Sequence, residues 1–202
     1  NAHVRGTPIM PVPQLHQNFE QMQAHARDLL VRQVLNDSLN LTVSCLNNAH
    51  LFLALISAQK ASGSRQLSQE QQEQAQQAQK DFVSLRLEQK FDFLEEQYSI
   101  LCEQEDTIIS IAYCLQALMS QGGIVKEEQA DENGLLVLEL ASAANSLAGV
   151  PDLQDANLQW DRKTFRPSDR VILADTDLQN IILTVGVFAR RLFTAVARFA
   201  RN

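Results

Sequence analysis

The sequence predicts an all-α protein, in which an elongated helical bundle is built on a long antiparallel helical hairpin with coiled-coil character and ends in an amphipathic helix. Proline, which most disfavours helix interiors, is missing between Pro13 and Pro151, and glycine occurs there at only five positions. Apolar residues recur at three- and four-residue spacing through most of this stretch, as on one face of a helix. With 45% hydrophobic and 20% charged residues, the composition is typical of a folded globular protein.

The N-terminal part divides into a short flexible segment and a long helix. We interpret residues 1–13 as a flexible or non-native segment and residues 14–202 as one helical domain. Helical spacing of apolar residues predicts a helix over 14–60, and the sequence Asn36-Asp37-Ser38 can split it near residue 37, because these residue types favour helix starts. The repeating apolar residues are Leu15, Phe19, Met22, Ala26, Leu30, Val34, Leu41, Cys45, Phe52 and Leu55.

A second helix is predicted over residues 67–121 from a heptad pattern. Ser68 with Gln71 matches a capping box at its start, and Gly122-Gly123 stops it. Five heptads are long enough to indicate a coiled coil, within one chain or between two copies. Glu105 occupies an apolar position, so we expect an interruption near 103–106. The pattern consists of Leu87, Leu94, Leu101, Ile108 and Leu115, each followed four residues later by Phe91, Tyr98, Glu105, Ala112 and Met119.

The region after Gly123 is predicted to hold one short helix and one long loop. The nearly continuous apolar run over 134–148 favours a buried helix that ends near Gly149 and Pro151, with a strand over 135–140 as the alternative. Residues 150–174 are polar and irregular, so we expect a loop. Loops of this length are usually functional.

The last helix is predicted over residues 175–201, with acidic residues at its start and arginines at its end, as the helix dipole favours. At 100° per residue its arginines form one stripe, and an apolar face lies opposite. We take this helix as the candidate site of contact with a partner or membrane. The candidate residues are Phe188, Arg190, Arg191, Leu192, Phe193, Val196, Arg198, Phe199 and Arg201.

Three interpretations of this helix stay open at the sequence level. It can pack its apolar face on the bundle, with the arginines solvated or paired with the acidic region 88–139. It can dock in a groove of a partner protein. It can adsorb to an anionic membrane surface. A membrane-spanning role is disfavoured, because Arg190 and Arg191 interrupt the apolar run.

The predicted loop carries a second set of candidate contact residues. Aromatic residues interleaved with cations can stack on single-stranded nucleic acid. The protein carries a net charge of −7, which argues against nucleic acid, so we expect the aromatic residues to pin the loop to the bundle. The candidates are Trp160, Arg162, Lys163, Phe165 and Arg166.

No motif for catalysis, metal or cofactor stands out, so we predict that the protein is not an enzyme and needs no cofactor. The sequence lacks a Glu-x-x-His pair, a phosphate-binding glycine loop and a Gly-x-Ser-x-Gly elbow. Glu88, Asp92, Glu95 and Glu96 share a helix face but have no histidine beside them, which favours a solvated flank. The three cysteines are expected to be reduced core thiols, in keeping with a cytoplasmic protein.

These features favour a non-catalytic protein–protein interaction module, such as an adaptor, assembly component, chaperone or helical effector. The partner is expected to be a protein, with self-association through the heptad helix as one route; nucleic acid is not expected. The alternative function is a peripheral membrane-associating protein that uses its basic C-terminal helix. Leaderless export also stays open.

Overall fold

The chain is mostly helical and carries one small antiparallel sheet. The computed structural model describes residues 19–63, 68–143 and 158–201, so the predicted segment 1–13 lies outside the described residues. The short 3₁₀ helix η1 is Glu127–Gln129. The other elements, in chain order, are α1 (Phe19–Ser62), α2 (Gln69–Ser84), α3 (Leu87–Tyr98), α4 (Glu105–Ser120), β1 (Leu136–Ala143), β2 (Leu158–Phe165) and α5 (Asp175–Arg201).

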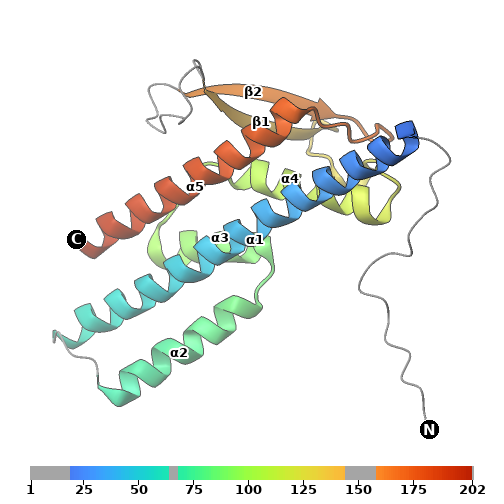
Figure 1. Cartoon of the computed structure of the whole chain (residues 1–202). Helices are drawn as coiled ribbons and strands as arrows, with labels where there is room; N and C mark the ends of the chain where they lie inside the picture. Colours follow the sequence, from blue (N-terminus) through green and yellow to red (C-terminus); the bar gives the residue numbers. More distant parts are fainter. Residues whose placement is uncertain (1–18, 64–67, 144–157, 202) are drawn as a thin grey trace, which may run out of the picture.

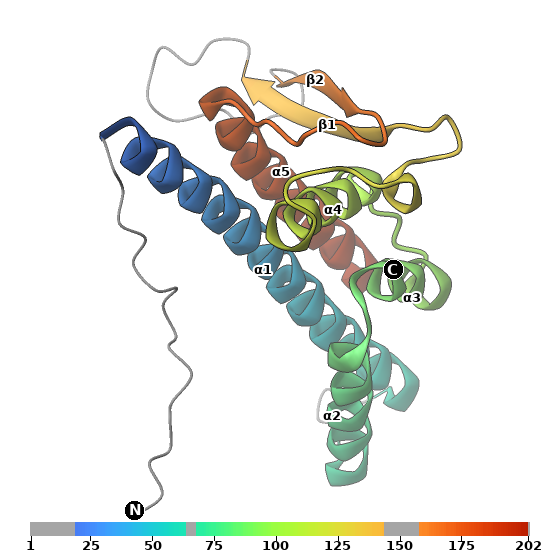
Figure 2. The same ribbon diagram turned by 90° about the vertical axis from the view of Figure 1, so that its right-hand side faces the viewer.

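Helices α1 and α5 lie side by side and run in the same direction (Figure 1). Contacts at both ends fix this arrangement. Near the start of both helices, Arg27 forms an ion pair with Asp175 at 2.6 Å. Near their ends, the Lys60 ammonium donates to the Phe199 carbonyl at 2.6 Å. The sheet lies over α4 and the first half of α5, and α2 lies at the opposite end of the molecule (Figure 2).

Two apolar clusters form the core, and α1 contributes to both. The first joins Val31 and Leu35 of α1 to α4, to the inward side of β1 and to the start of α5. The second joins Leu46 and Leu53 of α1 to α3 and to the second half of α5, with Phe82 of α2. Helices α1 and α5 therefore both run through the two clusters and link the sheet end of the molecule to the α2 end.

The helix expected over 67–121 is in fact three helices, so that prediction is wrong. The first break falls at Leu85 and Arg86, both in extended conformation. No proline or glycine marks this break. A side-chain contact stabilises it: the ammonium of buried Lys90 donates to the carbonyls of Phe82 and Val83 in the last turn of α2. A lysine thus replaces the capping glycine that usually ends a helix.

The second break lies at 99–104, where the sequence predicted an interruption near Glu105. Ser99 adopts a left-handed conformation with φ of 53°, and Ile100 donates back to the Leu94 carbonyl, as in a Schellman cap. Ile100 is buried and Leu101 is 67% exposed. The regular heptad pattern therefore fails here, because the chain leaves the helix and rotates Leu101 into solvent.

The helix predicted over 134–148 is wrong, and so is the wholly irregular loop over 150–174. Residues Leu136–Ala143 form β1, which pairs antiparallel with β2, with Leu138 opposite Lys163. Leu136, Leu138 and Leu140 are buried and Glu139 is exposed, as the two-residue period of a strand requires. Half-buried Val137 is apolar as well, which masks this alternation in the sequence. Residues 144–157 lie outside the described residues.

Side chains satisfy two amides and one carbonyl on the edge of β1 that does not face β2. The Glu139 amide donates to the Thr107 hydroxyl at 3.2 Å, and this hydroxyl donates to the Glu139 carbonyl at 3.3 Å. The Ala141 amide donates to the Thr184 hydroxyl at 2.8 Å. Unpaired backbone groups at a strand edge can pair with another chain and favour aggregation. The hydroxyls from α4 and α5 occupy some of these groups and so stabilise the two-stranded sheet.

Candidate interaction surface

The candidate contact residues of α5 divide between the core and the surface. Phe188, Leu192 and Val196 are buried in the second apolar cluster. Phe199 is half-buried against Tyr98, and Phe193 is partly exposed. Phe188, Leu192 and Val196 are therefore used to attach α5 to the bundle, which corresponds to the first of the three interpretations of this helix.

The arginines of α5 face the connector between α3 and α4. Arg191 forms an ion pair with Glu103, within the acidic region 88–139. Its guanidinium also lies 5.7 Å from the ring centre of Trp160 on β2. Arg191 also lines a cavity of about 290 Å³ together with Arg190 and Arg198, and Leu101 lies at the border of this cavity. Arg201 is exposed at the end of the helix.

The candidates of the predicted loop lie on or just after β2. Phe165 is buried in the first cluster, and the Lys163 ammonium pairs with Asp177 at the start of α5. These two residues attach β2 to the bundle. Trp160, Arg162 and Arg166 are exposed, and Arg162 is opposite Glu139 in the strand pairing. The structure thus brings Trp160 close to Arg191 of the other candidate set but leaves Arg166 apart.

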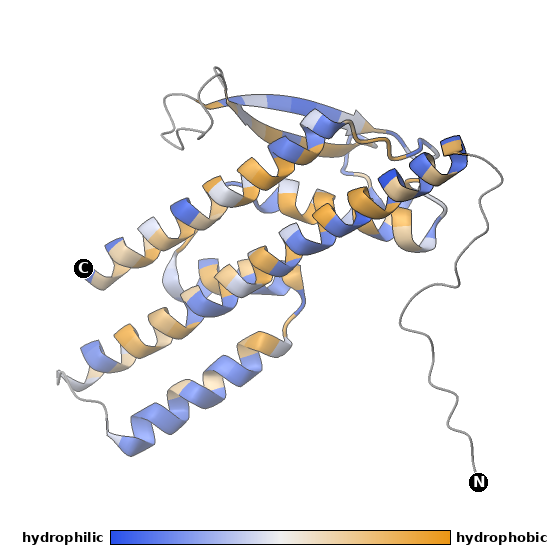
Figure 3. Cartoon of the chain, viewed as in Figure 1, coloured by the Kyte–Doolittle hydropathy of each residue, from blue (hydrophilic) through white to orange (hydrophobic). Residues whose placement is uncertain are grey.

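The most unusual surface lies on the outward side of α1. Its inner side contains the buried polar residues Ser38, Thr42 and His50. Its outward side carries large apolar residues that are between 52% and 65% exposed. Apolar residues lie on both the buried and the exposed side of this helix, and Figure 3 shows hydrophobic segments repeated along its length. A helix that is apolar on more than one side is typically covered on more than one side. We call the exposed set, Phe19, Leu30, Leu41 and Phe52, the outer stripe of α1.

The outer stripe has regular spacing, and its second half has almost no charged neighbours. Its four residues are each eleven positions apart, which places them on one side of a helix with a drift of about 20° per interval. Between Gln33 and Gln59, Asp37 is the only charged residue among the exposed positions of α1. On α5, Ile182 and Phe193 are also exposed and eleven residues apart. Consecutive members of the outer stripe lie about 16 Å apart along the helix, so they form a spaced row of exposed apolar residues on one side of α1.

A buried polar cluster holds the opposite side of α1 against α2 and α3. The His50 Nδ1 lies 2.6 Å from the Gln79 amide oxygen, and the Gln79 amide nitrogen donates to the Asn47 carbonyl at 2.9 Å. His50 Nδ1 must therefore donate, which makes Nε2 an acceptor. Nε2 is buried without a hydrogen-bond partner among the described residues. Burial lowers the pKa of His50, and the Lys90 charge lowers it further while the Gln79 bond opposes both.

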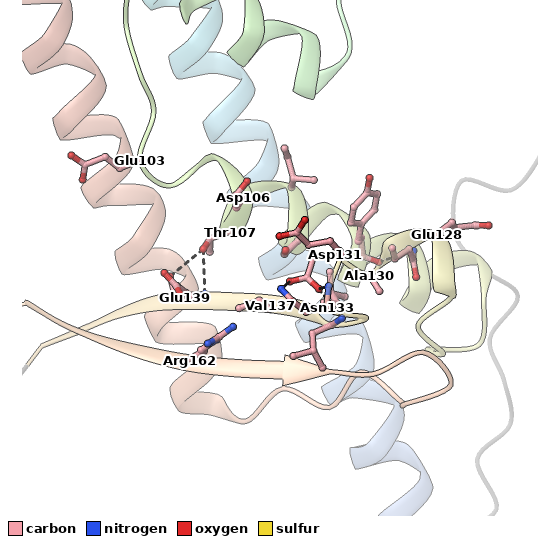
Figure 4. A pocket seen from close by; sticks show the side chains of 17 residues that line it. Glu103, Asp106, Thr107, Glu128, Ala130, Asp131, Asn133, Val137, Glu139 and Arg162 are labelled. Carbon is pink, nitrogen blue, oxygen red and sulfur yellow. Dashed lines mark hydrogen bonds between the residues drawn. The ribbon is translucent and has the colours of Figure 1, made fainter.

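A second cavity, of about 550 Å³, lies between α4, the segment after η1 and the sheet. Figure 4 shows Asp106 on its α4 side, and Glu139 and Arg162 on its sheet side. Asp131 accepts hydrogen bonds from the amides of Leu135 and Asn133, which lowers the pKa of its carboxyl and closes a turn. The cavity is acidic, and the hydrogen bonds in it are internal to the protein.

Glu105 is the most perturbed carboxyl near these cavities. Burial raises its pKa to about 7, and the charges of Asp92, Asp106 and Glu95 contribute further. Burial raises the pKa of the neighbouring Cys102 thiol to about 12, which makes it a poor nucleophile. Within residues 19–63, 68–143 and 158–201, no group of three or more His, Cys, Asp or Glu side chains could hold a metal ion.

Comparison of the chain with models of protein families, with curated proteins and with solved structures finds no significant match. The surface therefore has to be interpreted from its own chemistry.

Sequence reasoning named α5 and β2 as contact elements and did not separate the outer stripe of α1. The signal was present, since Phe19, Leu30, Leu41 and Phe52 all belong to the apolar repeat of the first predicted helix. What the repeat does not reveal is which apolar residues face the bundle. Both sides of α1 carry them, so the spacing alone cannot identify the exposed side.

Proposed function

We propose that this protein is a non-catalytic protein–protein interaction module, an adaptor, assembly component, chaperone or helical effector, that acts through helix faces. One observation carries the proposal: α1 presents large apolar side chains to solvent at regular spacing, although its inner side already supplies apolar residues such as Leu35 and Leu46 to the core. Isolated exposed apolar residues are common, but a regular stripe along a helix of 44 residues is typical of a docking surface.

The hairpin with coiled-coil character that the sequence favours has a role in this proposal. Helix α2 runs back along the second half of α1, where Gln79 bonds to the Asn47 carbonyl, and Lys90 of α3 bonds to the Asn47 side chain. These contacts restrain α1 from its inner side. A restrained helix loses little conformational entropy when its outward side binds, which favours affinity.

A reducing compartment such as the cytoplasm suits this proposal. Cys45, Cys102 and Cys114 are all free thiols, and Cys45 and Cys114 are buried. Burial raises the pKa of the Cys114 thiol to about 12 and also raises that of Cys45, so neither is reactive.

Membrane association through α5 is the competing proposal. Helices α1 and α5 are both long and apolar enough to cross a membrane, a criterion that core helices of soluble proteins also meet. Adsorption of α5 would require the apolar face that now packs in the core, including Phe188 and Leu192. Between Leu30 and Gln59, the exposed positions of α1 carry no cation that anionic lipids could attract. Both facts favour a protein partner.

A photo-crosslinking experiment tests the proposal. A photoreactive phenylalanine analogue replaces Leu41, and the full chain is irradiated in an extract of the cells that produce it. The matched control carries the analogue at Gln76, an exposed position of α2. We expect protein adducts from position 41, including adducts between copies of this chain, and none from position 76. Adducts with lipid only, or equal adducts from both positions, would contradict the proposed function.

Flotation of the full chain with anionic vesicles tests the competing proposal. We expect the protein to stay in the soluble fraction, both unchanged and with Phe193→Glu. If the unchanged chain floats and Phe193→Glu does not, the membrane proposal replaces ours.

A further inference from the structure

The residue types of the outer stripe of α1 follow the same order from either end of the helix. From Phe19 to Phe52 its residues are Phe, Leu, Leu and Phe, at equal intervals of eleven. The midpoint lies between Leu35 and Asn36. A twofold axis through this midpoint would place each stripe residue of one helix opposite a stripe residue of an identical antiparallel helix. Symmetric dimers require this self-complementarity, because residue i must contact j while j contacts i.

We propose that the occupant of the outer stripe is a second copy of this chain, with the two α1 helices packed antiparallel about that axis. Phe19 then contacts Phe52 of the second copy, and Leu30 contacts Leu41 of the second copy. The inference rests on the proposed function, since it names the partner of the same surface. It differs from self-association through the heptad helix, because Leu94 and Ile108 of that pattern are buried in the core.

The shape of α1 permits this contact over most of its length. The stripe spans 34 residues, which is about 50 Å of helix, and drifts by only about 60° over that distance. No described element covers the outward side of α1, which forms one edge of the molecule in Figure 2. Two helices can therefore approach to the usual axial distance of roughly 8–10 Å.

The polar residues along the stripe suit contact with an identical helix. The other exposed residues between Leu30 and Gln59 are almost all uncharged amides and hydroxyls, which can both donate and accept hydrogen bonds across the axis. A strongly charged partner would find no complementary charge here. The set comprises Gln33, Asn36, Asp37, Asn40, Ser44 and Asn48.

The buried area is adequate for a stable dimer. From their exposed fractions and the usual areas of phenylalanine and leucine, the four stripe residues offer about 400 Å² per chain. Two chains then bury about 800 Å², and the exposed polar residues on the same side of α1, Asp37, Ser44 and Asn48, bring the total to the roughly 1,000 Å² expected of a specific interface.

Size-exclusion chromatography with light scattering of the full chain gives the first test. We expect a mass of twice 22.6 kDa at micromolar concentration. Leu30→Glu and Leu41→Glu should each yield the monomer, raising the dissociation constant by about 100-fold or more, because the dimer buries two new charges. Leu101→Glu is the matched control, since Leu101 is just as exposed but lies off the stripe. It should leave the mass unchanged, and circular dichroism should show all three variants folded.

Asp37 gives an independent test of the axis. It lies within two residues of the midpoint, so the Asp37 carboxylates of the two copies come close and repel each other. Asp37→Asn should therefore tighten the dimer several-fold at low salt. The same substitution would weaken or leave unchanged an interface that places residue 37 elsewhere.

Disulfide crosslinking distinguishes antiparallel from parallel packing. Asp37→Cys should form a covalent dimer under mild oxidation, because residue 37 lies close to residue 37 of the second copy. Asn48→Cys lies on the same side of α1 but about 35–40 Å from residue 48 of the second copy, so it should not. The unchanged chain controls for the three native cysteines. Crosslinking through both positions would overturn the antiparallel geometry.

The failure of this inference can be told apart from failure of the proposed function. A chain that is monomeric at all concentrations, or a dimer that Leu41→Glu does not affect, overturns the second copy as occupant. If crosslinks from position 41 then still reach other proteins, the proposed function stands with a different partner. If position 41 reaches no protein at all, both are overturned.

Discussion

Lys90 is the residue whose removal tests the fold most directly. Its side chain is 2% exposed, and its ammonium donates to three acceptors on two helices. The Asn47 amide oxygen and the Val83 carbonyl each lie 3.1 Å away, and the Phe82 carbonyl is the third. The ammonium also lies 4.4 Å from the Phe82 ring centre. Lys90 therefore ends α2 and joins it to α1.

Lys90→Met keeps the length of the side chain and removes all its donors. Each hydrogen bond to a charged group contributes about 1.5–3 kcal/mol, and the carbonyls left behind are largely shielded from water. Removing the ammonium also removes the free energy needed to bury a charge, which offsets part of this loss; burial of the charge is the reason that the pKa of Lys90 is lowered. We expect the free energy of unfolding to fall by about 2–4 kcal/mol, which for a chain of 202 residues lowers Tm by roughly 5–15 °C.

Thermal and urea unfolding followed by circular dichroism at pH 7 measure this change. Lys80→Met is the matched control, because Lys80 lies on α2 but is exposed, and we expect its Tm to stay within about 2 °C of the parent. If Lys90→Met melts with the parent, the break between α2 and α3 does not depend on this cap and our explanation of it is wrong.

Further predictions concern pH, the sheet edge and the broken heptad pattern. The pKa of Glu105 is raised, so folding favours its protonated form and the free energy of unfolding should fall as pH rises from about 4.5 through about 7. Glu105→Gln should remove this loss and raise the free energy of unfolding by about 1–2 kcal/mol in urea at pH 8. An unchanged pH dependence in this variant would refute the assignment to Glu105. The lowered pKa of His50 has the opposite effect: stability should fall as pH drops below about 6.5, since the unfolded state gains the proton first, and His50→Phe should flatten the Tm profile between pH 5 and 7. Thr107→Val should cost about 1–2 kcal/mol by exposing the edge of β1, and faster hydrogen exchange at the Glu139 amide would show it. Leu101→Asp should change the free energy of unfolding by no more than about 0.5 kcal/mol, because Leu101 is exposed. A loss of several kcal/mol would instead indicate that Leu101 is buried, as the heptad pattern implied.

Local sequence determined several parts of this protein by itself. The predominance of helix follows from the scarcity of proline and glycine, and the starts of α2 and α5 follow from their capping and acidic residues. The ion pair of Arg191 with the acidic region 88–139 could also be predicted, because the arginines lie in the last helix and most of the acidic residues lie earlier in the chain. These features depend on residues close in sequence or on net charge, which a linear pattern records.

Only the tertiary structure decided where the long helix breaks, that β1 is a strand, and which side of α1 is exposed. Lys90 ends α2 through acceptors on two helices, and Thr107 and Thr184 stabilise β1 from two more. Thr107 and Thr184 are 32 and 43 residues from the backbone that they satisfy. Lys90 is only seven or eight residues from the carbonyls of α2, but its ammonium is also held by Asn47, 43 residues away on α1, so local propensity could not predict either outcome. For α1, leucines and phenylalanines lie all round the helix, and only the positions of α2, α4 and α5 determine which of them water reaches.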